Sequence, residues 1–252
     1  MGTLIAVTGK GGVGKTTVSA LLVRQLAANG KTPVLAIDAD PNSCLDAALG
    51  VKAEKTVGGV REEARQKVQK GMSGISKQEF LQLKIAESLV EADGFDLIAM
   101  GRPEGAGCYC YANNVLKSVI AEISEQYPYV VLDNEAGLEN LSRRIVARVN
   151  LLLIVSDASN AGLETVKRLH LLANEMGIKY DKLVVVINRL RNGMPEKAEM
   201  LKGATGAEAV IGLPDDAGVA GFAEQGRSFT QLDNDNKVLQ LIDKVVKEYI
   251  IG

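Results

Sequence analysis

The chain has 252 residues, of which 46% are hydrophobic and 24% are charged, with a net charge of −2 at pH 7. This balance is typical of a globular protein with a sizeable core and excludes disordered or collagen-like chains. The pI near 5.7 argues against a protein whose main partner is nucleic acid or an anionic membrane. We therefore expect a single domain over residues 1–252, with no nucleic-acid partner and no membrane partner.

The start of the chain and its cysteine content indicate the compartment. Charged and glycine-rich residues follow the first short apolar run, which is unlike a secretory signal peptide. No apolar run reaches the roughly 20 residues of a membrane span. With three cysteines in the whole chain, a reducing, cytoplasmic location is expected.

Continuous apolar runs recur along the chain and lack alternation, which predicts strands buried on both faces of a mostly parallel sheet. They lie at residues 4–7, 34–37, 97–100, 130–132, 151–155, 183–187 and 209–211. Helical segments are expected between them at residues 18–29, 113–126, 141–149, 162–176 and 236–250, and a capping-box pattern at Ser76 and Glu79 predicts another that extends through Leu89. The pattern predicts an α/β fold, a three-layer domain whose ligands bind at the carboxyl ends of the strands.

The strongest motif follows the first predicted strand. Residues 9–17 read Gly-Lys-Gly-Gly-Val-Gly-Lys-Thr-Thr and contain the phosphate-loop pattern G-x-x-x-x-G-K-T, between an apolar run and a helical segment. Glycines bring backbone N–H groups close to phosphate oxygens, and the helix adds its positive N-terminal end. The predicted phosphate-binding residues are Gly11, Gly12, Val13, Gly14, Lys15, Thr16 and Thr17. Lys15 would reach the terminal phosphates and Thr16 would bind Mg²⁺, whereas the motif does not require Lys10.

Two carboxylates, Asp38 and Asp40, follow the second predicted strand, and Pro41 ends it. One carboxylate could lie towards Mg²⁺ or its waters, and the other towards an attacking water. An ordinary turn is the alternative, because aspartate next to proline is a common turn former.

A third carboxylate, Asp133, ends the strand at residues 130–132 and is the usual kind of second group on the Mg²⁺ side. Gly137 follows four residues later, where its N–H could sense the γ-phosphate. The alternative for Asp133 is a buried aspartate that caps the next helix.

Asn188 and Arg189 end the strand at residues 183–187. The amide could hydrogen-bond the edge of adenine, and the guanidinium could stack on the ring. On these residues alone, a solvated loop is an equal alternative.

Cys108 and Cys110 lie one residue apart in a glycine-rich loop. Two thiolates cannot complete a tetrahedral metal site, but two chains related by a two-fold axis would supply four, suited to Zn²⁺, Ni²⁺ or an iron–sulfur cluster. Two ordinary thiols are the alternative. We expect a packing role for Cys44, and a core or surface role for His170.

Together, the phosphate loop, Asp38-x-Asp40-Pro41 and Asp133-x-x-Ala136-Gly137 resemble the deviant phosphate-loop ATPases, which include the nitrogenase iron protein and the Min and Par positioning ATPases. The resemblance covers essentially the whole chain. It implies that Lys10 crosses a dimer interface to the partner's nucleotide and that Asp40 polarises the attacking water. It also implies that Asn188 contacts adenine and that the loop with Pro214 completes the base pocket.

Within that family, Cys108-Tyr109-Cys110 looks most like the CooC-type nickel insertion ATPases of carbon monoxide dehydrogenase or acetyl-CoA synthase. In those proteins the two cysteines of each subunit form a metal site across the dimer. The position after Gly-x-Glu of the second switch is Asn140 here, where the family commonly has histidine. No cysteine follows Asp133, unlike the nitrogenase iron protein, so a four-iron cluster held in that way is not expected.

The leading hypothesis is a cytoplasmic homodimer that uses ATP and Mg²⁺ to control binding of Ni²⁺ or Zn²⁺ at Cys108 and Cys110. Its client would be apo carbon monoxide dehydrogenase or acetyl-CoA synthase. The alternatives are an ATP-gated iron–sulfur reductase component and a membrane- or DNA-positioning ATPase. The positioning role would need a basic amphipathic last helix, whereas residues 236–250 predict packing on the sheet.

Overall fold

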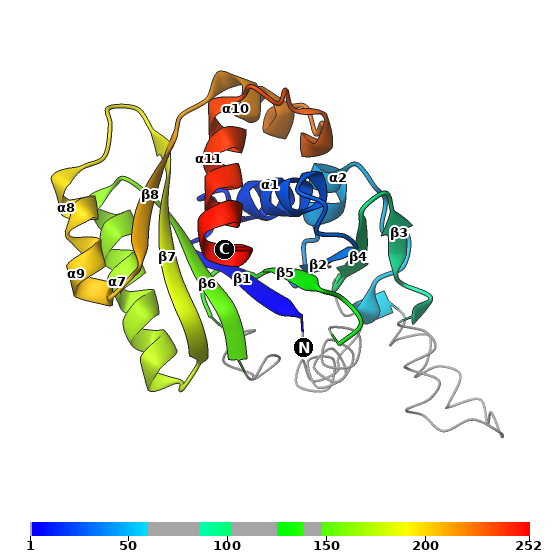
Figure 1. The fold of residues 1–252 in the computed structure, drawn as a ribbon, viewed down its shortest axis with the longest axis horizontal. Coiled ribbons are helices and arrows are strands. Elements are labelled where there is room, and N and C mark those ends of the chain that lie inside the picture. Colours follow the sequence, from blue (N-terminus) through cyan, green and yellow to red (C-terminus); the bar gives the residue numbers. More distant parts are fainter. Residues whose placement is uncertain (1, 60–85, 102–124, 139–147) are drawn as a thin grey trace.

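The computed structural model describes residues 2–59, 86–101, 125–138 and 148–252, and an eight-stranded sheet lies at its centre (Figure 1). The strands are β1 (Thr3–Gly9), β2 (Val34–Asp38), β3 (Val90–Ala92), β4 (Phe95–Ala99), β5 (Tyr129–Asp133), β6 (Arg148–Asp157), β7 (Lys179–Leu190) and β8 (Ala209–Pro214). They lie in the order β3-β4-β2-β5-β1-β6-β7-β8, and every pair is parallel except β3 with β4. The predicted α/β class with a mostly parallel sheet is confirmed.

Helices cover both faces of this sheet (Figure 1). They are α1 (Lys15–Ala28), α2 (Leu45–Leu49), α7 (Asn160–Glu175), α8 (Glu196–Glu199), α9 (Leu201–Thr205), α10 (Ala217–Glu224), η1 (Phe229–Gln231), α11 (Lys237–Val245) and η2 (Val246–Ile250). Along β1, Leu4 and Ala6 join the apolar cluster that includes α7, whereas Ile5 and Val7 join the cluster that includes α1 and α11. Strands buried on both faces explain the uninterrupted apolar runs. None of the described helices is long and apolar enough to cross a membrane.

The phosphate-loop segment leaves β1 in the middle of the sheet, between β5 and β6. The chain continues to β2 on one side of β1 and reaches β6 on the other, so the order of strands reverses there. Such a reversal is where open α/β sheets bind ligands beyond the carboxyl ends of their strands.

Two of the predicted helices need correction at their ends. Leu89 was expected in a helix but directly precedes β3, which pairs with β4 across Asp93 and Gly94; a two-residue Asp-Gly turn favours such a hairpin. The helix predicted to end at Val149 is wrong at its end, because Val149 already belongs to β6 and pairs with Tyr180 of β7.

The short helices α2, α8, α9 and α10 were not expected either. They have four to eight residues, too few to show a helical periodicity in the sequence. The remaining residues of the helices predicted at 76–89, 113–126 and 141–149 lie mostly outside the described residues.

Candidate functional site

The phosphate loop joins the end of β1 to the start of α1 and depends on glycine at defined points. A Cβ at Gly9 would lie 2.1 Å from the carbonyl oxygen of Val155 on the adjacent strand, and Gly14 has a φ of +94°. Gly14 is the N-cap of α1, and because it has no side chain it leaves the first N–H groups of the helix uncapped. The N–H groups of the first turn are therefore suited to bind an anion.

Lys15 lies folded back into this loop. Its Nζ donates a hydrogen bond to the carbonyl of Lys10 at 3.1 Å, and the residue is buried. Burial lowers the pKa of Lys15, whereas the carboxylates of Asp133, Asp40 and Glu135 oppose that shift. The ammonium group thus lies in the loop with acidic groups nearby, where phosphate oxygens could replace the Lys10 carbonyl.

The carboxylates Asp38 and Asp133 lie on neighbouring strands as register partners, both fully buried. Burial raises the pKa of Asp133 to about 7, against hydrogen bonds from the hydroxyls of Thr16 and Ser19, the latter at 3.1 Å. Burial also raises the pKa of Asp38 to about 6. The buried carboxylate of Asp133 and the Thr16 hydroxyl that bonds to it are hard oxygen ligands. A divalent cation would stabilise the charged carboxylate, so Thr16 and Asp133 fit Mg²⁺.

Asp38 also holds the start of α2. Its carboxylate accepts hydrogen bonds from the backbone N–H groups of Asp40, Cys44 and Leu45, at 3.1, 2.9 and 2.9 Å. Asp38 therefore caps the start of α2, whereas the start of the helix that Asp133 was predicted to cap as an alternative lies outside the described residues.

The carboxylate of Asp40 is turned towards its own loop. It accepts the backbone N–H of Asn42 at 2.8 Å and the side-chain amide of Asn42 at 3.1 Å. The turn anticipated from the Asp-Pro sequence is present, and Asp40 lies half-exposed on it. Its predicted action on an attacking water stays a prediction.

The loop after β5 is tied to the end of β1. The Gly137 N–H donates to the carbonyl of Gly9 at 3.1 Å, and the Thr8 hydroxyl donates to the Gly137 carbonyl. The amide of Asn134 donates to the Val7 carbonyl at 3.0 Å, while its own oxygen is buried without a partner. Gly137 could sense a phosphate only after its N–H leaves Gly9.

Asn188 and Arg189, which are predicted to contact the base, both contact the phosphate loop in this structure. The Asn188 amide donates to the Val13 carbonyl at 2.9 Å, and the Arg189 guanidinium donates to the Gly12 carbonyl at 3.2 Å. The Asn188 amide has a second N–H and a second lone pair, which could bind a base without loss of the contact with Val13. Contact with a base therefore stays a prediction.

Pro214 lies beside this segment, and its predicted part in a base pocket stays a prediction. It pairs with Leu190 across β7 and β8. The N–H of Asp215 donates to the Leu190 carbonyl at 2.9 Å, and the Asp215 carboxylate pairs with Arg191 at 3.0 Å. The tertiary structure thus brings the loops after β7 and β8 together.

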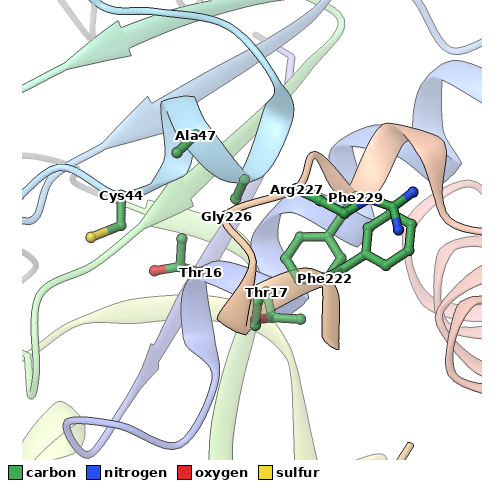
Figure 2. Close-up of a pocket in the computed structure, with 10 residues that line it drawn as sticks. Thr16, Thr17, Cys44, Ala47, Phe222, Gly226, Arg227 and Phe229 are labelled. Carbon is green, nitrogen blue, oxygen red and sulfur yellow. The ribbon is translucent and has the colours of Figure 1, made fainter. Parts of the chain in front are cut away.

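A hollow of about 160 Å³ opens beside Thr16, the last residue of the motif, and Thr17, which follows it (Figure 2). Its far wall holds the stacked rings of Phe222 and Phe229, with centroids 6.2 Å apart, and Arg227 lies 3.9 Å above the Phe222 ring. The hollow is smaller than the roughly 300–1,000 Å³ of drug-sized sites. It can hold part of a ligand whose phosphates occupy the loop.

Sequence reasoning found Thr16 and Thr17 but missed the other groups that line or support this hollow. The hollow is lined by Thr16, Thr17, Cys44, Ala47, Ala48, Phe222, Ala223, Gly226, Arg227 and Phe229. The only sign of these missed groups in the sequence was the run of alanine, glycine and phenylalanine in α10. Ser19 could have been found, because it lies one turn after Thr16 and faces the same way. The packing role predicted for Cys44 is wrong, since Cys44 is exposed where the chain turns into α2.

The predicted metal ligands Cys108 and Cys110 lie outside the described residues. Within the described ranges, no group of three or more His, Cys, Asp or Glu side chains is placed to hold a metal ion. His170 hydrogen-bonds Asn174 and Tyr180, in keeping with the expected structural role.

A phosphate loop at the reversal of the strand order, with two buried carboxylates at the next strand ends, defines a phosphate-loop nucleotide-binding protein. Residues 2–183 match the family described as AAA domain, and the chain belongs to this family of phosphate-loop ATPases.

Relatives match between two thirds and nearly all of the chain. An uncharacterized ATP-binding protein of Methanocaldococcus jannaschii is 39% identical over 98% of both chains. The carbon monoxide dehydrogenase accessory protein CooC of Rhodospirillum rubrum is 34% identical over 69% of this chain and 70% of its own. The resemblance to CooC-type ATPases is thereby confirmed.

Solved structures show the same fold. The cell division ATPase MinD of Pyrococcus furiosus superposes with a TM-score of 0.70 and 20% identity, over 98% of each chain. A ParA family ATPase of Chlorobium tepidum superposes with a TM-score of 0.75 and 16% identity, over 98% of this chain and all of its own. The fold is that of the MinD and ParA ATPases.

Proposed function

We propose that this chain is a homodimeric, Mg²⁺-dependent ATPase that couples ATP binding and hydrolysis to nickel binding and delivery. The client would be carbon monoxide dehydrogenase or acetyl-CoA synthase during maturation. The observation that carries the proposal is the Cys108-x-Cys110 pair in a chain 34% identical to a carbon monoxide dehydrogenase accessory protein. All 252 residues would form one ATPase domain.

In this proposal the phosphates of ATP bind the N–H groups of the phosphate loop, and Lys15 exchanges the Lys10 carbonyl for phosphate oxygens. Mg²⁺, held by Thr16 with Asp133 beside it, would neutralise phosphate charge. Thr17 would face the α-phosphate side, where the hollow continues from the loop. Asp40 would leave Asn42 and orient the attacking water.

The same proposal explains how ATP binding would change the conformation of the protein. Gly137 can bind a γ-phosphate only by giving up its bond to Gly9, so ATP and ADP make different contacts with the loop after β5. A ligand shifts a conformational equilibrium only through such differential contacts. Lys10 would reach the nucleotide of the second subunit, so that the ATP state is the closed dimer.

The test is anaerobic titration with Ni²⁺ and, separately, Zn²⁺, with and without ATP and Mg²⁺. The wild-type protein should bind one ion per dimer, and the double variant C108A/C110A should lose that ion but still bind ATP. C44A is the matched control and should keep one ion per dimer. Retention of the ion by the double variant, or metal affinity that does not change with nucleotide, would contradict the proposal.

A positioning ATPase is the second candidate. The septum site-determining protein MinD of Thermotoga maritima is 29% identical over 85% of this chain, which favours it. Against it, the apolar residues Val238, Leu239, Ile242 and Val245 of α11 are buried in the core, as predicted, so α11 has no free apolar face for a membrane. ATP-dependent sedimentation with anionic vesicles, or a shift of DNA, would support this candidate.

An ATP-gated iron–sulfur reductase is the third. It predicts a brown protein with a visible charge-transfer band after anaerobic purification. Colourless protein that binds Ni²⁺ would contradict it.

A further inference from the structure

The side chains of Asn188 and Arg189 bind two consecutive carbonyls of the phosphate loop, those of Val13 and Gly12. We propose that these two residues are positioning residues, a brace that holds the loop in its phosphate-binding conformation before any nucleotide arrives. The inference rests on the proposed binding of nucleotide phosphates at this loop. It assigns Asn188 and Arg189 a role distinct from reading the base.

Peptide geometry explains what the brace does. In a trans peptide unit the carbonyl of one residue and the N–H of the next point in opposite directions. The carbonyls of Gly12 and Val13 are drawn towards β7, so the N–H groups of Val13 and Gly14 point away from it. Consecutive N–H groups fixed on one side of a loop form a cradle for an anion.

The backbone of Arg189 shows that this contact is built into the end of β7. Arg189 has a φ of +57°, a left-handed conformation that is uncommon for residues other than glycine. In this conformation its N–H donates to the Asn188 amide oxygen at 2.9 Å. That bond fixes the amide so that its nitrogen faces Val13.

Close packing against Gly14 points to the same role. A Cβ on Gly14 would lie 2.5 Å from the Asn188 amide nitrogen, so the amide occupies the space that a side chain would take. Asn188 is buried, with 9% of its surface exposed. The glycine of the motif and the asparagine 174 positions later therefore fit each other, and the loop cannot relax towards β7.

The brace can be separated from base recognition with a ligand that has no base. Inorganic tripolyphosphate should bind the preformed loop, and its affinity is measured by calorimetry at fixed Mg²⁺ beside that of ATP. We expect N188A, R189K and R189G to bind both ligands about three- to tenfold more weakly, because each loses one hydrogen bond to the loop. Glycine accepts the φ of Arg189 without strain, so R189G isolates the guanidinium contact from any folding defect.

Matched controls lie on α7, away from the loop. Asn174 and Arg168 are exposed there, so N174A and R168K should bind both ligands with wild-type affinity. The melting temperature of each variant without ligand shows that it is folded.

Two results would overturn the brace. One is a loss of ATP affinity in the three variants with unchanged tripolyphosphate affinity, which would mean that the side chains contact the nucleoside. The other is a wild-type protein that binds ATP but not millimolar tripolyphosphate, because a preformed loop needs no base. A protein that passes these tests but neither hydrolyses ATP nor binds nickel would contradict the proposed function alone.

Discussion

Asp133 is the residue of this site whose burial has the largest effect on its pKa and on the stability of the protein. It is buried at the end of β5 beside Asp38, and burial raises its pKa from an ordinary 3.8 to about 7. A carboxylate kept in such a place lowers the stability of the unliganded protein. It is the kind of local cost that functional sites carry.

The pH dependence of stability follows from this shift. Between about pH 4 and pH 7 the folded chain keeps a proton on Asp133 that the unfolded chain has lost, so the free energy of unfolding falls as pH rises through this window. D133N removes that contribution. Without nucleotide or Mg²⁺, we expect D133N to gain on the order of 2–4 kcal/mol relative to wild type at pH 8, and little at pH 4.

Urea denaturation at pH 4, 6 and 8 measures this difference. Burial also raises the pKa of Asp38 to about 6, so the free energy of unfolding of D133N should still fall in part as pH rises. D181N is the control, because the hydrogen bond from Arg148 lowers the pKa of Asp181 and its contribution has the opposite sign. Parallel curves for wild type and D133N would show that Asp133 is ionised at its ordinary pKa.

At the scale of elements, β1, the phosphate loop and α1 form one unit whose geometry is set by the adjacent strand. Gly9 pairs with Val155 of β6, and there is no room for a side chain between them. Gly12 instead has open space around its Cα, and needs glycine only for its φ of +79°. Gly9 and Gly12 therefore serve different purposes in the loop.

Alanine substitutions should separate these purposes. G12A should lower the free energy of unfolding by about 1–2 kcal/mol, the cost of a left-handed residue with a Cβ. G9A should lower it by roughly 3 kcal/mol or more, because its Cβ would overlap a backbone oxygen that cannot move without parting β1 from β6. Urea denaturation compares them, and equal losses would show that the contact with Val155 does not constrain the loop.

The elements themselves were predictable to the extent that their signals are local. The apolar runs of residues 4–7, 34–37 and 183–187 gave buried strands, because burial on both faces leaves no alternation. The hairpin of β3 and β4 was missed although its Asp-Gly turn is a local signal. The short helices α2 and α10 have too few residues to show a periodicity. Leu45 and Leu49 of α2 are buried, and Asp216 caps the start of α10.

At the scale of the whole molecule, the proposed dimer makes a specific prediction about Lys10. Lys10 is exposed, and its contact with Lys15 uses its backbone carbonyl, which alanine retains. We therefore expect K10A to bind ATP within about threefold of wild type, but to lose ATP-dependent dimerisation and at least about tenfold of its hydrolysis rate.

Analytical ultracentrifugation with ATP and Mg²⁺, beside a phosphate-release assay, tests this expectation. K202A is the matched control, since Lys202 is exposed on α9. Removal of Mg²⁺ with EDTA should abolish the dimer in the wild type. Normal dimerisation by K10A would contradict a contact from Lys10 to the second nucleotide.

The sequence by itself determined the fold class, the phosphate loop and the carboxylates at the strand ends. A complete motif, apolar runs and a strand-ending aspartate are all read from neighbouring residues. The tertiary structure decided which strand ends meet. It paired Asp38 with Asp133, tied Gly137 to Gly9 and bound Asn188 to Val13, a residue 175 positions away. These contacts depend on the order of strands in the sheet, and that order is set by packing of the whole chain rather than by any local pattern.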